Sequence, residues 1–170
     1  MTSRTCAIRG AIGGIVVISA FTALASPAAA AAPDAPGLYR HTNGNYAFVS
    51  PSGSFHCGIA TTFGPMAGCT GELPASLPQS VPFRPNEVFG GNRWTDCGPN
   101  GYVAVESTGP YASCTTQPLW TTDSQLRVLP YGHSLSANGF TCRSEQAGVT
   151  CRHDDSGHAV TASRRKVVGR

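Results

Sequence analysis

Short runs of alternating apolar and polar residues recur along the chain, and glycine and proline separate them. Successive side chains of a β-strand lie on opposite faces, so this alternation predicts strands with one buried face. We expect strands at Tyr46–Ser50, Phe55–Thr61, Arg93–Cys97, Tyr102–Ser107, Tyr111–Thr115, Leu126–Leu129, Phe140–Ser144, Val149–His153 and His158–Ser163. Neither a sustained amphipathic helical period nor an internal repeat is visible there. The pattern predicts an all-β fold, a small antiparallel sandwich or barrel.

The first residues follow another pattern, in which an uncharged apolar run comes after a positive leader. Arg4 and Arg9 precede the run Ala11–Ala25, and small residues of the kind that signal peptidase requires come next. The run is shorter than the roughly 20 residues that span a bilayer, so it indicates a secretory signal peptide. Cleavage after Ala25 and cleavage within Ala28–Ala32 both fit. We expect a signal peptide over 1–32, a linker over 33–44 and a single β domain over 45–170.

This organisation predicts a secreted, extracellular protein with no membrane insertion after signal cleavage. Once Arg4 and Arg9 are removed, 10 Lys and Arg face 9 Asp and Glu, a net charge of +1. We therefore expect no nucleic-acid partner, since such proteins carry a large basic excess. The one basic cluster, Ser163–Arg170, fits contact with an anionic cell-surface polymer. We favour an edge strand and tail whose cations block unwanted strand pairing.

Cysteines indicate how so small a fold is stabilised. Without Cys6, which lies in the signal peptide, the chain has six: Cys57, Cys69, Cys97, Cys114, Cys142 and Cys151. An even number in an exported chain predicts three disulfides. No C-x-x-C pair is present, which argues against structural zinc. We expect a disulfide-stabilised β domain without a cofactor.

The closing stretch Phe140–Ser163 predicts one disulfide by its register. If Glu145–Gly148 closes a hairpin, Cys142 lies directly opposite Cys151. Opposed Cβ atoms are about 4.5–5.5 Å apart, and at a non-hydrogen-bonded pair they come within disulfide reach. Phe140, Cys142, Val149 and Cys151 then share a core face, and Arg143 and Arg152 point to the other side.

The next hairpin has two registers that fit. In the favoured one, a loop of Asp154–Gly157 sets His153 opposite His158, and these two imidazoles are weak candidates for a metal site. In the other, Gly157 forms a bulge and His153 faces Ala159. Two histidines beside a surface turn are usually polar residues at a sheet end, so we assign no metal.

The other disulfide pairings stay open at this point. Cys57–Cys69 would close a hairpin, and Cys97–Cys114 is also local in sequence. In a flat meander, however, the strand at Tyr102–Ser107 would hold Cys97 and Cys114 about 9.6 Å apart, beyond a disulfide's Cα limit of about 7 Å. Either those strands are not a flat meander, or one of the two cysteines pairs with Cys57 or Cys69.

The stretch Gly71–Asn92 contains four prolines, which rule out a central strand or a long helix. Its Phe83, Val88 and Phe89 could fold back on the core, but we favour a proline-stiffened surface loop. Trp94, Trp120 and the tyrosines fit a glycan or peptide surface, although burial in a small β core is the more ordinary use of aromatic residues.

The hydrolase signatures G-x-S-x-G and H-E-x-x-H are absent, and we assign no catalytic residue. His56 beside Cys57 is a poor nucleophile pair, because neighbours on a strand point to opposite faces. A spatial triad remains an alternative, with His153, His158 and Asp155, or His133 beside Tyr131, as its candidates.

Two groups of motifs lie towards the two ends of the mature chain. The first is Ser50, Pro51, Ser52, Gly53 and Cys57. The second is Leu129, Pro130, Tyr131 and Gly132, followed by Cys142, Gly148, Val149, Thr150, Cys151, Gly157 and His158. Together they resemble a family of small exported actinobacterial proteins with a domain of unknown function. The resemblance covers most of the mature chain, loosely in its middle and least in the proline-rich stretch. It implies export and a disulfide-bonded fold, and it supplies no catalytic residues.

Together these features favour a secreted, disulfide-bonded, non-enzymatic β domain that binds a cell-envelope or other extracellular partner. The alternatives are a secreted hydrolase with an unrecognised active site and a small protease inhibitor. An inhibitor would need a rigid exposed loop next to a disulfide.

Overall fold

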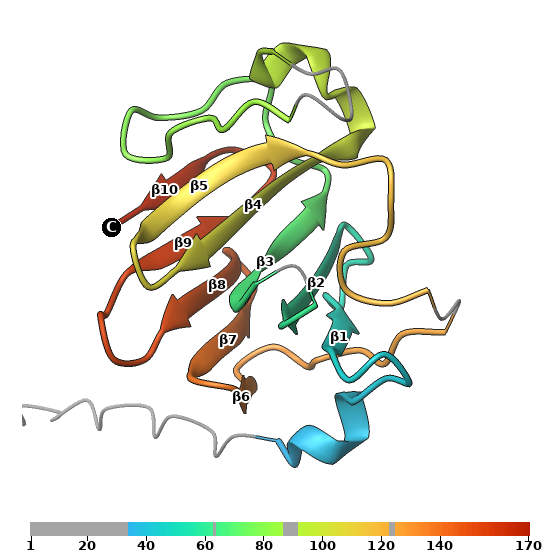
Figure 1. The fold of residues 1–170 in the computed structure, drawn as a ribbon. Helices are drawn as coiled ribbons and strands as arrows, with labels where there is room; N and C mark the ends of the chain where they lie inside the picture. The colour runs from blue at the N-terminus through green and yellow to red at the C-terminus, as the bar shows by residue number, and fades with distance from the viewer. Residues whose placement is uncertain (1–33, 63, 87–91, 123–124) are drawn as a thin grey trace, which may run out of the picture.

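The fold is a sandwich of two antiparallel sheets (Figure 1). The computed structural model describes residues 34–62, 64–86, 92–122 and 125–170, so the expected signal peptide lies outside the described residues. One sheet, the N-terminal sheet, contains in order β1 (Tyr46–Val49), β2 (Phe55–Ala60), β3 (Met66–Gly71), β4 (Gly101–Glu106) and β5 (Gly109–Cys114). The other, the C-terminal sheet, contains β6 (Ser134–Ala137), β7 (Phe140–Glu145), β8 (Gly148–His153), β9 (Ala159–Ala162) and β10 (Val167–Gly169). The all-β prediction is confirmed, and the unclosed sheets make a sandwich rather than a barrel.

The core lies between the sheets, where β3 packs on β7 and β8, and β4 packs on β8 and β9. Phe48, Ile59, Val103, Leu135 and Phe140 are at most 1% exposed there. Burying each such side chain contributes about 1.5–3 kcal/mol. A shift of one residue in the pairing would turn these side chains out of the core, so the alternating pattern fixes the register of the strands. Among the described residues, no helix is long and apolar enough to cross a membrane.

The two sheets contain the same disulfide-linked hairpin. Cys57 of β2 opposes Cys69 of β3, and Cys142 of β7 opposes Cys151 of β8. Both pairs are bonded, and in each the two Cα atoms are 4.0 Å apart. Both hairpins begin with Phe-x-Cys. The fold therefore contains a structural repeat, although no internal repeat was predicted from the sequence. The loops between the paired strands differ in length, and only Phe and Cys coincide between the two hairpins.

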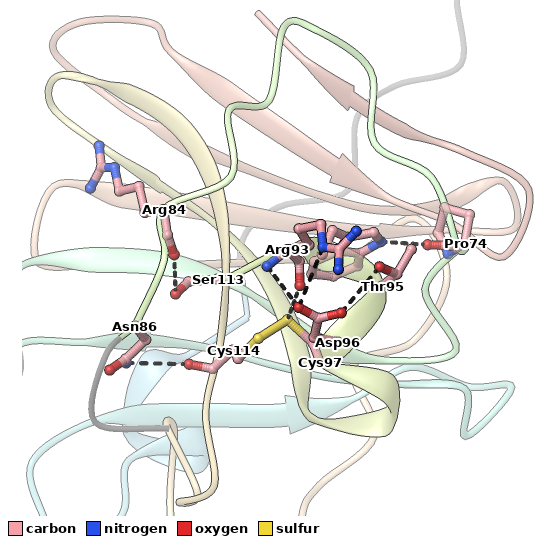
Figure 2. The surroundings of a disulfide bond; sticks show 10 residues. Pro74, Arg84, Asn86, Arg93, Thr95, Asp96, Cys97, Ser113 and Cys114 are labelled. Carbon is pink, nitrogen blue, oxygen red and sulfur yellow. Dashed lines mark hydrogen bonds and ion pairs between the residues drawn. A yellow bond between two sulfur atoms is a disulfide. The ribbon is translucent and has the colours of Figure 1, made fainter. Parts of the chain in front are cut away.

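The third disulfide joins Cys97 to Cys114 at the edge of the N-terminal sheet (Figure 2). The strand expected at Arg93–Cys97 is wrong. The segment instead forms a short 3-10 helix, η3 (Trp94–Asp96), which a second one, η4 (Gly98–Asn100), continues into β4. Because these turns fold back beside β5, the Cα atoms of the two cysteines lie 5.2 Å apart. The three segments are thus not a flat meander. Cys97 pairs with Cys114, and neither of them pairs with Cys57 or Cys69.

Residues 34–44 of the expected linker are part of the folded domain. They contain the 3-10 helix η1 (Pro36–Tyr39), in which Tyr39 is only 5% exposed and belongs to the core. Asp34 donates its main-chain N–H to the carbonyl of Ser134 on β6. The N-terminal segment therefore covers the β6 edge of the C-terminal sheet.

The proline-rich segment covers the opposite side of the sandwich. Val81 is 1% exposed within the core, and Phe83 forms an isolated bridge to Ala112 of β5. The favoured interpretation as a surface loop is thus wrong at residues 81–83, where the chain folds back onto the core. Val88 and Phe89 lie outside the described residues. Backbone pairing at this edge blocks the addition of a further strand to β5.

A second, smaller cluster covers the outer face of the N-terminal sheet. Ala47, Gly58, Gly68 and Ala104 oppose one another in a row across four strands. The indole of Trp120 lies on this row: a Cβ placed on Gly58 would meet the Cβ of Trp120 at 2.9 Å. Small residues thus make room for a large ring, and Trp120 is 3% exposed. Its burial confirms the structural use of this aromatic residue.

Candidate functional site

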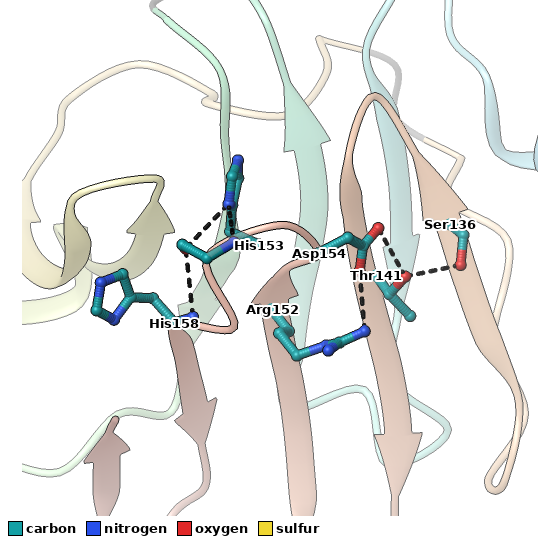
Figure 3. A network of polar contacts seen from close by, with 7 residues as sticks. Ser136, Thr141, Arg152, His153, Asp154 and His158 are labelled. Atoms are coloured by element: carbon teal, nitrogen blue, oxygen red, sulfur yellow. Dashed lines mark hydrogen bonds and ion pairs between the residues drawn. The ribbon is translucent and has the colours of Figure 1, made fainter.

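His153 and His158 face each other in the ladder, but their rings do not meet. Cys151 pairs with Val160, the register that places His153 opposite His158, and the main-chain N–H of His153 donates to the carbonyl of His158 at 2.9 Å. The shifted register, with His153 opposite Ala159, is wrong. Figure 3 shows the two imidazoles pointing apart.

The partners of His153 account for its orientation. Its Nδ1 lies 3.0 Å from the hydroxyl of Ser156 and accepts the main-chain N–H of that residue at 3.1 Å. Its ring packs edge-on against Phe140. Asp154 instead accepts hydrogen bonds from Thr141 and Arg152 (Figure 3). Among the described residues, no three His, Cys, Asp or Glu side chains are grouped to hold a metal ion.

His133 has a carboxylate partner that the sequence did not reveal. Its Nδ1 is 2.8 Å from Oδ1 of Asp34, and the buried hydroxyl of Tyr39 donates to Oδ2 of Asp34 at 2.8 Å. The hydrogen bond to His133, and next that to Tyr39, lower the pKa of Asp34. Burial, and next the bond to Asp34, raise the pKa of Tyr39 to about 12. These three side chains fasten the N-terminal segment to the start of β6.

We expect Asp34→Asn to lower the free energy of unfolding by about 1 kcal/mol at pH 7, because a charge-assisted bond becomes a neutral one. The folded-state pKa of Asp34 lies below its ordinary value of 3.8, so this contribution is present above that value and disappears as the pH falls through the lowered pKa. Urea unfolding of both proteins at pH 7 and at about pH 2 measures it. The exposed Asp155→Asn is the control. If Asp34→Asn lowered the free energy of unfolding by the same amount at both pH values, this account would be contradicted.

A polar concavity lies at one end of the sandwich, where turns from both sheets meet. It has a volume of about 450 Å³ and is lined by Ser50 and Ser52 of the β1–β2 turn, Tyr131, residues 145–149 of the β7–β8 turn and Ser163–Lys166 of the β9–β10 turn. We call it the end pocket. It brings together residues of the Ser-Pro-Ser-Gly motif, of the Leu-Pro-Tyr-Gly motif and of the basic cluster.

The β9–β10 turn presents two arginines at its tip. The hydroxyl of Ser163 donates to the carbonyl of Lys166 at 2.8 Å and accepts the main-chain N–H of Lys166 at 3.2 Å. Because Ser163 closes the turn from both ends, Arg164 and Arg165 occupy its middle, and both are exposed. Arg164 has one distant acidic neighbour, Glu72, at 4.0 Å. The basic cluster is therefore a formed turn followed by an edge strand, rather than a loose tail.

The Ser-Pro-Ser-Gly turn holds its hydroxyls by local bonds. Gly53 donates its N–H to the carbonyl of Ser50 at 2.9 Å, and the hydroxyl of Ser50 accepts the N–H of Phe55 at 3.1 Å. Ser50 is 3% exposed, so its role is structural, whereas Ser52 is exposed at the rim of the pocket. The two hydroxyl oxygens are 3.2 Å apart.

The Leu-Pro-Tyr-Gly turn positions Tyr131. His133 donates its N–H to the carbonyl of Pro130, and Gly132 at the third position has a φ of 83°. That left-handed conformation is what a type II turn requires, which explains glycine at this position. Tyr131 is thereby held at the turn's corner, where it is 41% exposed. Tyr131 lines the pocket, and a phenol hydroxyl can donate a hydrogen bond.

The end pocket is cationic in an otherwise nearly neutral chain. Arg164, Arg165 and Lys166 lie on it, and its one lining carboxylate, Glu145, pairs with Arg143 at 3.0 Å. The sequence showed the basic cluster, the hairpin turn at Glu145–Gly148 and the Ser-Pro-Ser-Gly and Leu-Pro-Tyr-Gly motifs separately. Their convergence was not predicted, because the lining residues come from segments far apart in the chain. The chain was compared with protein-family models, with curated proteins and with solved structures, and none matches it.

Proposed function

We propose that this protein is an exported, non-enzymatic β domain that binds an anionic polymer of the cell envelope or its surroundings in the end pocket. One observation carries the proposal: three cationic side chains converge with hydroxyl groups on a pocket of about 450 Å³. The expected signal peptide and the three disulfides support export, as does the resemblance to an exported actinobacterial family.

The chemistry of the pocket favours oxyacid groups. A guanidinium presents a planar set of donors that matches two oxygens of a phosphate or a carboxylate, and Arg164 and Arg165, both exposed, line the pocket. Hydroxyls of Tyr131 and Ser52 add neutral donors. The rigid turns reduce the conformational freedom that binding has to remove.

The distribution of charge over the molecule also supports binding of an anion at the end pocket. The mature chain has a net charge of +1, and the end pocket alone has three cations. The remainder of the molecule is therefore slightly acidic and repels an anionic polymer, so binding is directed to one face.

Isothermal titration of the mature protein with short-chain polyphosphate and with poly-glutamate tests the proposal, and neutral dextran is the negative probe. We expect binding to one or both polyanions and none to dextran. The two polyanions distinguish a phosphate source from a carboxylate source. Binding should weaken steeply with added salt, because each cationic contact competes with ions in solution.

The double variant Arg164→Ala/Arg165→Ala should weaken binding tenfold or more, since each charge-assisted hydrogen bond contributes about 1.5 kcal/mol. Arg40→Ala/Arg127→Ala removes the same charge from exposed positions outside the pocket and is the matched control. Equal losses in the two variants would show that net charge, and not the end pocket, governs binding. No binding to either polyanion would overturn the proposal.

The His133–Asp34 pair is the observation that would favour a hydrolase. A histidine held by a carboxylate is one part of such a site, and the other is an open hydroxyl beside it. The hydroxyl bonded to this pair belongs to Tyr39, which donates to Asp34 and is 5% exposed. In the described residues no hydrogen bond joins a hydroxyl to the ring of His133. The arrangement therefore supports a structural role, in which it fastens the N-terminal segment to β6, better than a catalytic one.

A further inference from the structure

We propose that residues 74–80 form a rigid loop that enters the substrate cleft of an endopeptidase with a small primary specificity pocket, of the elastase type, and inhibits it. We call this segment, with the sequence Pro-Ala-Ser-Leu-Pro-Gln-Ser, the proline loop. It lies outside the end pocket, so this proposal is independent of anion binding. Figure 1 shows the segment as a long green loop projecting from the sandwich near β5 and β10.

Proline predisposes the loop to the conformation that a protease cleft accepts. Each proline fixes its own φ and disfavours helical geometry in the residue before it, so Pro74 and Pro78 restrict Leu73 and Leu77 to extended forms. In the structure, residues 75–78 form neither helix nor strand. Because the two prolines reduce the number of conformations open to the loop, it loses less conformational entropy on binding.

The backbone in the middle of the loop is unpaired. Among the described residues, the main-chain N–H groups of Ala75, Ser76 and Leu77 have no hydrogen-bond partner. Clefts that bind extended peptides do so largely by main-chain hydrogen bonds, as when a strand is added to a sheet edge. The proline loop therefore offers both the shape and the free donors for such pairing.

The start of the loop is fixed near the Cys97–Cys114 disulfide (Figure 2). There the indole N–H of Trp94 donates to the carbonyl of Pro74 at 2.9 Å. At the far end, the hydroxyl of Ser80 accepts the main-chain N–H of Gly169 in β10 at 3.4 Å. The loop is thus held at one end near a disulfide and at the other end on an edge strand.

Burial also fixes the loop from within. Leu77 is half-buried against the core, whereas Ala75, Ser76 and Gln79 are exposed. The side chains available to a partner at the centre are thus those of Ala75 and Ser76. Small side chains fit the small primary pocket of an elastase and not the deep acidic pocket of trypsin. No Lys or Arg lies within the loop.

The test is inhibition of pancreatic elastase and of trypsin by the mature protein, each measured with a short chromogenic peptide substrate. We expect near-stoichiometric loss of elastase activity at micromolar or lower inhibitor, and no loss of trypsin activity. Unchanged elastase activity at equimolar protein would overturn the proposal. So would rapid cleavage within residues 74–80 without inhibition, because the loop would then be an ordinary substrate.

A substitution that changes which protease is inhibited distinguishes direct binding by the proline loop from an effect on folding. We expect Ala75→Arg or Ser76→Arg to transfer inhibition from elastase to trypsin by at least a hundredfold, since both side chains are exposed and trypsin requires a cation there. Thr116→Arg, which adds the same group at an exposed position elsewhere, should not change either inhibition constant. Arg164→Ala/Arg165→Ala should leave inhibition intact, which distinguishes failure of this proposal from failure of anion binding.

Discussion

Replacing Phe140 with alanine is expected to lower the free energy of unfolding by about 3–5 kcal/mol. Phe140 opens β7, is 1% exposed and lies in the core between the sheets. Its ring also packs edge-on against His153, with ring centroids 5.0 Å apart. The variant loses the transfer free energy of a buried ring and leaves a cavity that the disulfide-linked hairpin cannot collapse to fill.

Urea unfolding followed by circular dichroism measures this loss. Leu38→Ala is the matched control, because it removes a large apolar side chain that is 55% exposed, and we expect a change within about 0.5 kcal/mol. If Phe140→Ala cost less than about 1.5 kcal/mol, the two sheets would not share the core described above.

The double variant Cys142→Ala/Cys151→Ala should lower the free energy of unfolding by about 3 kcal/mol. The two cysteines are nine residues apart in sequence, and closing such a loop restricts the unfolded chain by about 2.6 kcal/mol in the chain-entropy model. Both residues are 0% exposed, so losing their sulfur atoms adds a packing term. Both must be replaced, since one remaining thiol could exchange with the other disulfides.

Cys57→Ala/Cys69→Ala is an internal check, because it removes the same bond from the equivalent hairpin of the N-terminal sheet. Its loop spans twelve residues, and the chain-entropy term is nearly equal. Equilibrium unfolding in urea should give similar losses for the two double variants. A loss below about 1 kcal/mol in both would mean that the sheets alone stabilise the fold.

Alternation predicted β7, β8 and β9 well because their apolar residues are large, whereas β6 was not predicted. Phe140, Cys142 and Val149 mark one face without ambiguity, so the hairpin register and its disulfide followed from the pattern, and the structure confirms both. The register of the next hairpin followed from keeping Val160 on the same face, which the structure also confirms. What the register could not decide was where the rings of His153 and His158 point.

Strands made of small residues gave no such signal. β3 contains Gly68 and Gly71, and glycine is depleted from strands, so no strand was predicted there. Gly68 is suited to its position because the backbone of Val103 and Ala104 on β4 comes too close for a side chain. Arg93–Cys97 failed for a different reason: its tryptophan and threonine favour a strand, but local capping between Arg93 and Asp96 bends it into a 3-10 turn.

The candidate sites could not be predicted from the sequence, because they are made of residues from loops that lie far apart in the chain. Glu145–Gly148 was predicted as a turn and Ser163–Arg170 as a basic edge strand and tail, whereas the turn that presents Arg164 and Arg165 was not predicted. Their convergence depends on how the two sheets stack, which alternation does not encode. The His133–Asp34 pair depends on residues 34–44 packing onto β6, and a small-residue, proline-containing stretch gave no sign of that.

Mapping of backbone amide chemical shifts tests the central claim most directly. The isotope-labelled mature protein is titrated with short-chain polyphosphate, and each perturbed amide is assigned to the fold. We predict that the largest shifts fall in residues 50–54, 130–132, 145–148 and 163–166, the turns around the end pocket, and that they vanish in Arg164→Ala/Arg165→Ala. Shifts scattered over the surface, or centred elsewhere, would contradict the assignment of this pocket as an anion-binding site.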